Sequence, residues 1–112
     1  MPRTPNLSLM PLELTRQVTS LGLRIRGARQ ARRLRLEDIA DKTGLSRKTV
    51  EAVERGEPST SLGAYVAVLG SMGLGQELDL LADPGLDREG LALNFSVAEK
   101  RVKLPRKIDN DF

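Results

Sequence analysis

Two short helical patterns, joined by a glycine and a serine, constrain the fold of this chain more than any other feature of its sequence. Apolar side chains at helical spacing in residues 36–40 are followed by Gly44, which readily takes the left-handed conformation in which helices end. Ser46 can cap the next helix, because its hydroxyl can accept a hydrogen bond from the amide of Lys48 or Thr49. These residues predict two helices joined by a tight turn.

Helical periodicity continues on both sides of this pair. Before it, apolar residues at spacings of four and three form one stripe of a helix: Leu14, Val18, Leu21, Ile25 and Ala28. This helix starts either near Leu12, with Pro11 in its first turn, or later, with Ser20 as its cap. After the pair, residues 62–72 predict a fourth helix and residues 76–81 a short fifth one. The sequence thus predicts an all-α protein with five helices in one domain.

The segment after the Asp83-Pro84-Gly85 turn is compatible with two structures. As a strand, its apolar residues alternate at period two: Leu91, Leu93, Phe95 and Val97. As a helix, they form one stripe: Leu86, Gly90, Leu93 and Val97. We therefore divide the chain into an N-terminal arm, a helical domain, a C-terminal arm that is an extra helix or a short strand, and a flexible tail: residues 1–14, 15–82, 83–104 and 105–112.

The formal charge of +3 is unevenly distributed along the chain. Residues 16–55 carry 11 basic and five acidic side chains, whereas residues 56–98 carry one basic and six acidic side chains. Six arginines fall within twelve residues with no acid between them: Arg24, Arg26, Arg29, Arg32, Arg33 and Arg35. Such a run can be a solvated helix face, but a basic half beside an acidic half indicates a polyanion on one side and a different partner on the other.

Several classes of function are excluded by composition. The chain has no histidine and no cysteine, so zinc fingers, disulfide scaffolds, cysteine nucleophiles and histidine bases are ruled out. The neighbouring acids Glu37 and Asp38 suit the first turn of a helix better than acid–base catalysis. We expect no enzyme activity, no metal and no cofactor. An apolar run of about 20 residues is lacking, and residues 1–20 do not resemble a signal peptide, so we expect a cytoplasmic protein without membrane contact.

The order and spacing of these residues resemble the lambda-repressor-like, or XRE, family of helix-turn-helix domains. The resemblance covers about residues 21–74 and rests on five groups: Leu23-Arg24-Ile25-Arg26, Leu36-Glu37-Asp38-Ile39-Ala40, Gly44-Leu45-Ser46, Thr49-Val50 and Val53-Glu54-Arg55-Gly56. It implies that the helix opened by Ser46 enters the major groove of double-stranded DNA. It also implies a homodimer on the palindromic half-sites of an operator, about 34–36 Å apart.

The resemblance also implies roles for individual residues. Base edges would be contacted by the outward residues of the second helix: Arg47, Lys48, Thr49, Glu51 and Ala52. Phosphates would be contacted by Arg35, Ser46 and Arg55. Arg29 and Glu54 match a pair that joins the first and third helices in relatives, which implies a structural ion pair and excludes Arg29 as a DNA ligand. Leu36 departs from the Gln or Ser that many relatives have, and no phosphate contact is assigned to it.

The second half of the chain is similar to HipB-type antitoxins. The similarity rests on Leu62-Gly63, Leu80-Leu81-Ala82-Asp83-Pro84, Lys100-Arg101-Val102 and Pro105-Arg106-Lys107. It implies a bacterial, nucleoid-associated repressor of its own operon that holds a HipA-type kinase toxin inactive, with the C-terminal arm in dimer or partner contact. A stand-alone or phage-type repressor is an alternative. A protein-interaction module that has lost DNA readout is a third.

Overall fold

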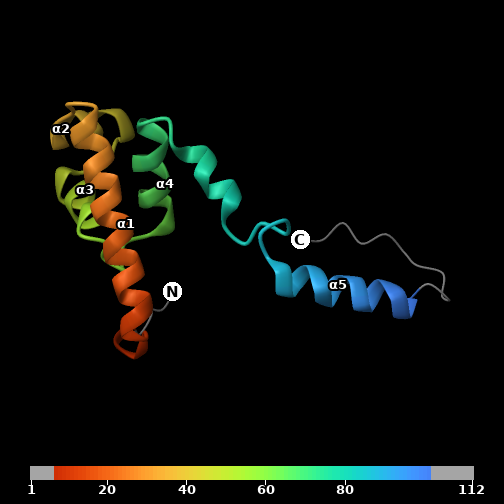
Figure 1. Ribbon diagram of the computed structural model, residues 1–112. Helices are drawn as coiled ribbons and strands as arrows, with labels where there is room; N and C mark the ends of the chain where they lie inside the picture. The colour runs from red at the N-terminus through yellow and green to blue at the C-terminus, as the bar shows by residue number, and fades with distance from the viewer. Residues whose placement is uncertain (1–6, 102–112) are drawn as a thin grey trace, which may run out of the picture. The chain divides into compact units, whose positions relative to one another are not determined.

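The computed structural model describes residues 7–101, and every regular element in that range is helical. The elements are η1 (Leu7–Leu9), α1 (Leu12–Ala31), α2 (Leu36–Thr43), α3 (Arg47–Glu54), α4 (Leu62–Ser71), η2 (Gly75–Leu80) and α5 (Arg88–Arg101) (Figure 1). The all-α class is confirmed, and the C-terminal arm contains a helix, not a strand. The predicted flexible tail, residues 105–112, lies outside the described residues.

Two details of the predicted helices are settled by the structure. The first helix begins at Leu12, because the Pro11 carbonyl accepts from the amides of Leu14 and Thr15 at 3.0 and 3.1 Å. A proline suits this position, since it has no amide hydrogen to leave unpaired. The fifth short helix is present at Gly75–Leu80, and it is a 3-10 helix, the tighter type that proteins use in short pieces.

The chain divides into two compact units, residues up to Leu78 and residues from Asp79 onward. The core of the first unit is built from all four of its α-helices, whose fully buried side chains include Ile25, Ile39, Val50, Val53 and Val68. Helices α2 and α3 have eight residues each, too few for independent stability, so packing against this core holds them. The core thereby fixes the angle between the two short helices.

The backbone of helix α1 packs directly against the backbone at the end of α3. Gly22 is buried there, and a Cβ atom added to it would lie only 2.7 Å from the carbonyl oxygen of Glu54. Gly56 closes α3 with a φ of +67°, a conformation that glycine adopts without steric cost. Its amide donates to the Val53 carbonyl, and the amide of Glu57 donates to Ala52. Two glycines therefore set how closely α1 and α3 approach.

The second unit is described here by itself. The Asp87 carboxylate accepts from the amide of Gly90 at 2.9 Å and so caps the start of α5. The large apolar residues of this unit are exposed: Leu80, Leu81, Leu86, Leu91, Leu93, Phe95 and Val97. Four of them, Leu91, Leu93, Phe95 and Val97, lie on more than one side of α5, a distribution typical of helices that are buried when partnered. In the part of the chain that the structure describes, no helix has the length and apolar character needed to cross a membrane.

Candidate nucleic-acid interface

Helix α3 presents one face to the core and the other to the surface. The Ser46 hydroxyl caps it by accepting from the Thr49 amide at 3.1 Å, one of the two donors expected from the sequence. Val50 and Val53 are fully buried, and Arg47, Lys48 and Arg55 are exposed. The side of α3 opposite the two valines therefore forms an outward surface, and the packing of the valines attaches it to the core.

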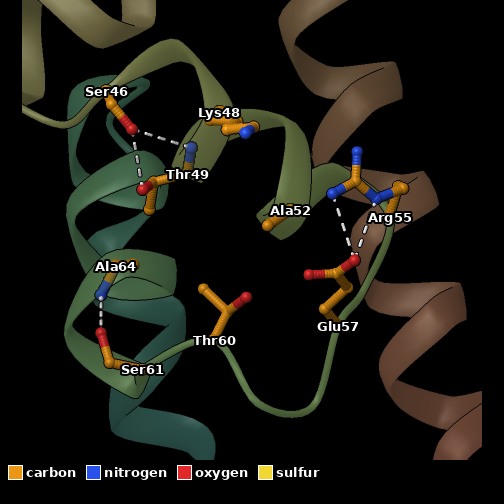
Figure 2. Close-up of a pocket in the computed structure, with 9 residues that line it drawn as sticks. All are labelled: Ser46, Lys48, Thr49, Ala52, Arg55, Glu57, Thr60, Ser61 and Ala64. Carbon is orange, nitrogen blue, oxygen red and sulfur yellow. Dashed lines mark hydrogen bonds and ion pairs between the residues drawn. The ribbon is translucent and has the colours of Figure 1, made fainter.

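An open groove of about 480 Å³ follows this surface (Figure 2). Ser46 and α3 supply one side through Lys48, Thr49, Ala52 and Arg55, and the loop after α3 with the start of α4 supplies the other: Glu57, Thr60, Ser61 and Ala64. The Thr49 hydroxyl lies 3.0 Å from the Ser46 hydroxyl, which orients both side chains. The groove thus offers an ammonium, a guanidinium, several hydroxyls and the methyl groups of two alanines.

Arg47 and Glu51 lie outside this groove. The guanidinium of Arg47 donates to Glu37 of α2 at 2.5 Å and to Glu51 at 3.2 Å. Because residues four apart share one stripe of a helix, Arg47 and Glu51 lie together on the flank of α3 that is nearest α2. Of the five residues predicted to contact bases, the groove therefore collects Lys48, Thr49 and Ala52, and a separate acid–base cluster joins α2 to α3.

The residues predicted to contact phosphate occupy three different settings. Ser46 lies at the start of α3, where it lines the groove. Arg35 precedes α2, and the Asp38 carboxylate accepts from its amide at 2.7 Å and from its guanidinium at 3.3 Å. These hydrogen bonds lower the pKa of Asp38 below its ordinary value. Arg55 lines the far end of the groove, where its Nε and Nη2 atoms both lie 3.1 Å from Glu57.

Lys48 differs from these arginines, since it has no ion pair among residues 7–97, whose side chains the structure describes. Its ammonium lies in the groove wall and is exposed to solvent. Arg47 and Arg55 each face a carboxylate of the same chain. Lys48 is therefore the basic group of α3 that can bind an anion without first leaving a partner.

Arg29 and Glu54 are brought together in the seam between α1 and α3. The guanidinium donates to both carboxylate oxygens, at 2.6 and 3.0 Å, and a third donor reaches the Leu34 carbonyl at 2.8 Å. The hydrogen bond to Glu54 raises the pKa of Arg29, and the attraction of the charges adds to it. With its donors directed inward, Arg29 is part of the architecture and does not line the groove.

The loop that forms the second wall was not assigned a function from the sequence. Its Ser and Thr residues at positions 59–61 are typical of a loop, and in the structure Ser61 caps α4 by accepting from the Ala64 amide at 3.1 Å. Glu57 and Thr60 have no motif that marks them as site residues. They enter the groove because Tyr65, buried in the core, donates its hydroxyl to the Glu57 carbonyl at 2.9 Å. Among the side chains that the structure describes, in residues 7–97, no cluster of three or more potential ligands could hold a metal ion.

A family model described as a helix-turn-helix domain matches residues 20–81, more than half of the chain. The fold and the exposed face of α3 agree with that match, since α2 and α3 are the two helices that the family's name describes. The chain belongs to this helix-turn-helix family, a class of DNA-binding proteins. No curated protein and no solved structure matches it significantly.

Proposed function

We propose that this protein is a sequence-specific transcriptional repressor that inserts α3 into the major groove of operator DNA. The observation that carries the proposal is the convergence of Lys48, Thr49 and Ala52 on one exposed face of a core-anchored helix. A major groove admits an α-helix, and an ammonium suits the O6 and N7 acceptors of guanine. The Thr49 and Ala52 methyl groups suit a thymine methyl.

Phosphate contacts would surround this base-reading face. Ser46 is near one end of α3 and Arg55 near the other, so the two can approach phosphates at opposite ends of the helix. Arg35, whose side chain is 75% exposed, is available on the α2 side. Charge-assisted hydrogen bonds of this kind set the position of the protein on the duplex, and the base contacts select the sequence.

Arg47 and Glu51 are assigned to base contacts at the α2 flank of the same helix. The Arg47 guanidinium has two carboxylate partners, so a contact with guanine requires it to leave Glu37. Glu51 can accept from the amino group of cytosine. Their role therefore depends on an exchange of partners that Lys48 does not need.

A homodimer on palindromic half-sites is part of the proposal. The exposed apolar residues of α5 support it, because a helix with apolar residues on several sides is stabilised when a partner covers it. The same helix could instead cover a HipA-type kinase toxin, which would make the protein an antitoxin that represses its own operon on the bacterial nucleoid. A stand-alone or phage-type repressor needs only the homodimer.

Binding to duplex DNA across a salt series tests the proposal. We expect tight binding to random duplex at 50 mM salt, a steep loss by about 200 mM, and sequence-selective binding to duplexes enriched from a random library. Failure to bind any duplex at the lowest salt would leave the protein-interaction module as the function. Stable copurification with the product of an adjacent kinase-like reading frame would distinguish the antitoxin from the stand-alone repressor.

A further inference from the structure

An acidic side chain stands in the wall of a groove that is otherwise suited to a polyanion. Glu57 lines the groove together with Lys48, Ser46 and Thr60 (Figure 2). Its carboxylate oxygen Oε1 accepts a hydrogen bond from Nε of Arg55 at 3.1 Å, and Nη2 of Arg55 lies 3.1 Å from the same oxygen. One oxygen of this carboxylate faces the Nε and Nη2 edge of the guanidinium, a position that a phosphate oxygen would take in a complex.

The backbone of Glu57 is held in place by three hydrogen bonds. Its amide donates to the Ala52 carbonyl at 3.1 Å, which ties it to the end of α3. Its carbonyl accepts from the Tyr65 hydroxyl at 2.9 Å and from the Thr60 amide at 3.1 Å. Tyr65 is part of the buried core, and burial raises the pKa of its hydroxyl, which keeps that hydroxyl protonated as a donor. The carboxylate is therefore presented to the groove by the fold itself.

The pair of Glu57 with Arg55 is also easily exchanged. Their side chains are 43% and 57% exposed, so water screens the attraction and little free energy is lost when the pair separates. A phosphate that replaced Glu57 would accept from the same Arg55 donors, and its negative charge would then lie close to the Glu57 carboxylate. Glu57 would then be left unpaired beside the DNA backbone, where like charges repel.

We propose that Glu57 is an internal competitor for the DNA backbone, occupying Arg55 until a phosphate displaces it. This inference rests on the proposed function and adds a residue that sets how strongly the groove attracts DNA of any sequence. Glu57 weakens the sequence-independent part of the affinity, which comes from phosphate contacts. Base contacts from Lys48 and Thr49 then supply a larger share of the total.

The substitution Glu57→Gln in the full chain tests this role. The amide keeps the size of the side chain and an acceptor for Arg55, but it removes the negative charge. We expect about three- to tenfold tighter binding to a random 30-base-pair duplex at 0.1 M salt, and a similar gain for a selected duplex. The dependence of log K on log salt should steepen by up to about 0.9, the value for one more phosphate contact.

Glu77→Gln is the matched control. Glu77 is exposed in η2, lies outside the groove, and loses the same unit of charge on substitution. We expect a change of less than about twofold in this control at 0.1 M salt, because an exposed charge that does not line the groove is screened over a Debye length of about 10 Å. An equal gain in both variants would show an effect of net charge alone and would overturn the proposal.

The Arg55→Ala background provides the decisive comparison. If Glu57 acts by occupying Arg55, most of the gain from Glu57→Gln disappears when Arg55 is absent; a full gain in that background overturns the proposal. An unchanged or weakened affinity in the single variant also overturns it, while leaving DNA binding itself intact. Failure of the unmodified protein to bind any duplex overturns the inference and the proposed function together.

Discussion

Two arginine–carboxylate pairs meet at the end of α3, where Glu54 belongs to one pair and its neighbour Arg55 to the other, but the pairs lie in opposite environments. The Arg29–Glu54 pair fills the seam between α1 and α3, with side chains 12% and 7% exposed. The Arg55–Glu57 pair lies at the groove, with side chains 57% and 43% exposed. The chemistry is the same, so burial decides the role: the seam pair cannot exchange partners with water or a ligand, and the groove pair can.

The largest effect is expected from removing the buried acid. Glu54→Ala leaves the Arg29 guanidinium in the seam without its carboxylate, and we expect a loss of about 3 kcal/mol in the free energy of unfolding. Urea unfolding followed by circular dichroism measures it. Glu57→Ala, the groove counterpart, should change stability by less than about 0.5 kcal/mol. Equal losses in the two variants would contradict the distinction between seam and groove.

The close contact in the seam gives the next largest effect. Gly22→Ala places a methyl group within 2.7 Å of the Glu54 carbonyl and should destabilise the domain by about 1–3 kcal/mol. Gly27→Ala is the control on the same helix, because a Cβ atom there meets nothing within 4 Å. It should stabilise the domain by up to about 1 kcal/mol through helix propensity. Thermal unfolding of the two variants compares them, and a stable Gly22→Ala protein would argue against the backbone contact.

Groove residues should affect DNA binding without affecting stability. Lys48→Ala is expected to cost about 1–3 kcal/mol of binding free energy at its matched base pair and to relax selection there. Arg55→Ala should weaken binding to all sequences to a similar extent and reduce the salt slope by about 1. Competition titrations with selected and random duplexes measure both. If both variants lost the preference for selected over random duplex to the same extent, the assignment of Lys48 to bases and Arg55 to phosphate would be wrong.

The smallest effect concerns pH. The folded pKa of Asp38 is depressed by the Arg35 amide and guanidinium, so the ionised form is favoured in the folded state. Its contribution is therefore complete above its unfolded pKa, near 3.8, and is lost as the pH falls through the depressed folded value. Acid titration of stability should show a shallower decline below about pH 4 in Asp38→Asn than in the unmodified protein. Identical declines would show that the capping hydrogen bond contributes nothing measurable.

Sequence patterns predicted the helices well because they depend on local physics. The stripe of apolar residues predicted α1. A start near Leu12, with Pro11 in the first turn, was one of the two starts that the sequence allowed. Gly44 ends α2 with a φ of +76°. The choice between helix and strand after residue 85 stayed open, since exposed apolar residues at positions 91–97 satisfy both periods. The 3-10 type of the helix at Gly75–Leu80 could not be predicted either, because the spacing of apolar residues over six positions does not distinguish it from an α-helix.

Local patterns in the sequence identified only some of the residues that line the site. Outward positions on α3 follow from the inward valines, so Lys48, Thr49 and Ala52 could be named from the sequence. The separation of Arg47 from Lys48 could not, because it depends on Glu37 approaching from α2. Glu57 and Thr60 were not anticipated as site residues, since their place in the groove wall is set by a hydrogen bond from Tyr65, eight residues after Glu57.

By itself, the sequence determined the helical class, the turn between the two short helices and the core-facing side of α3. Hydrophobic periodicity, capping and backbone preference act over a few neighbouring residues, so the order of residues in the sequence displays them directly. The resemblance to relatives implied the pairing of Arg29 with Glu54, but only the tertiary structure decided how fully each charge is buried. That decision arises from contacts between residues 25 apart, such as Arg29 with Glu54, whose free energy depends on how fully the packed helices exclude water.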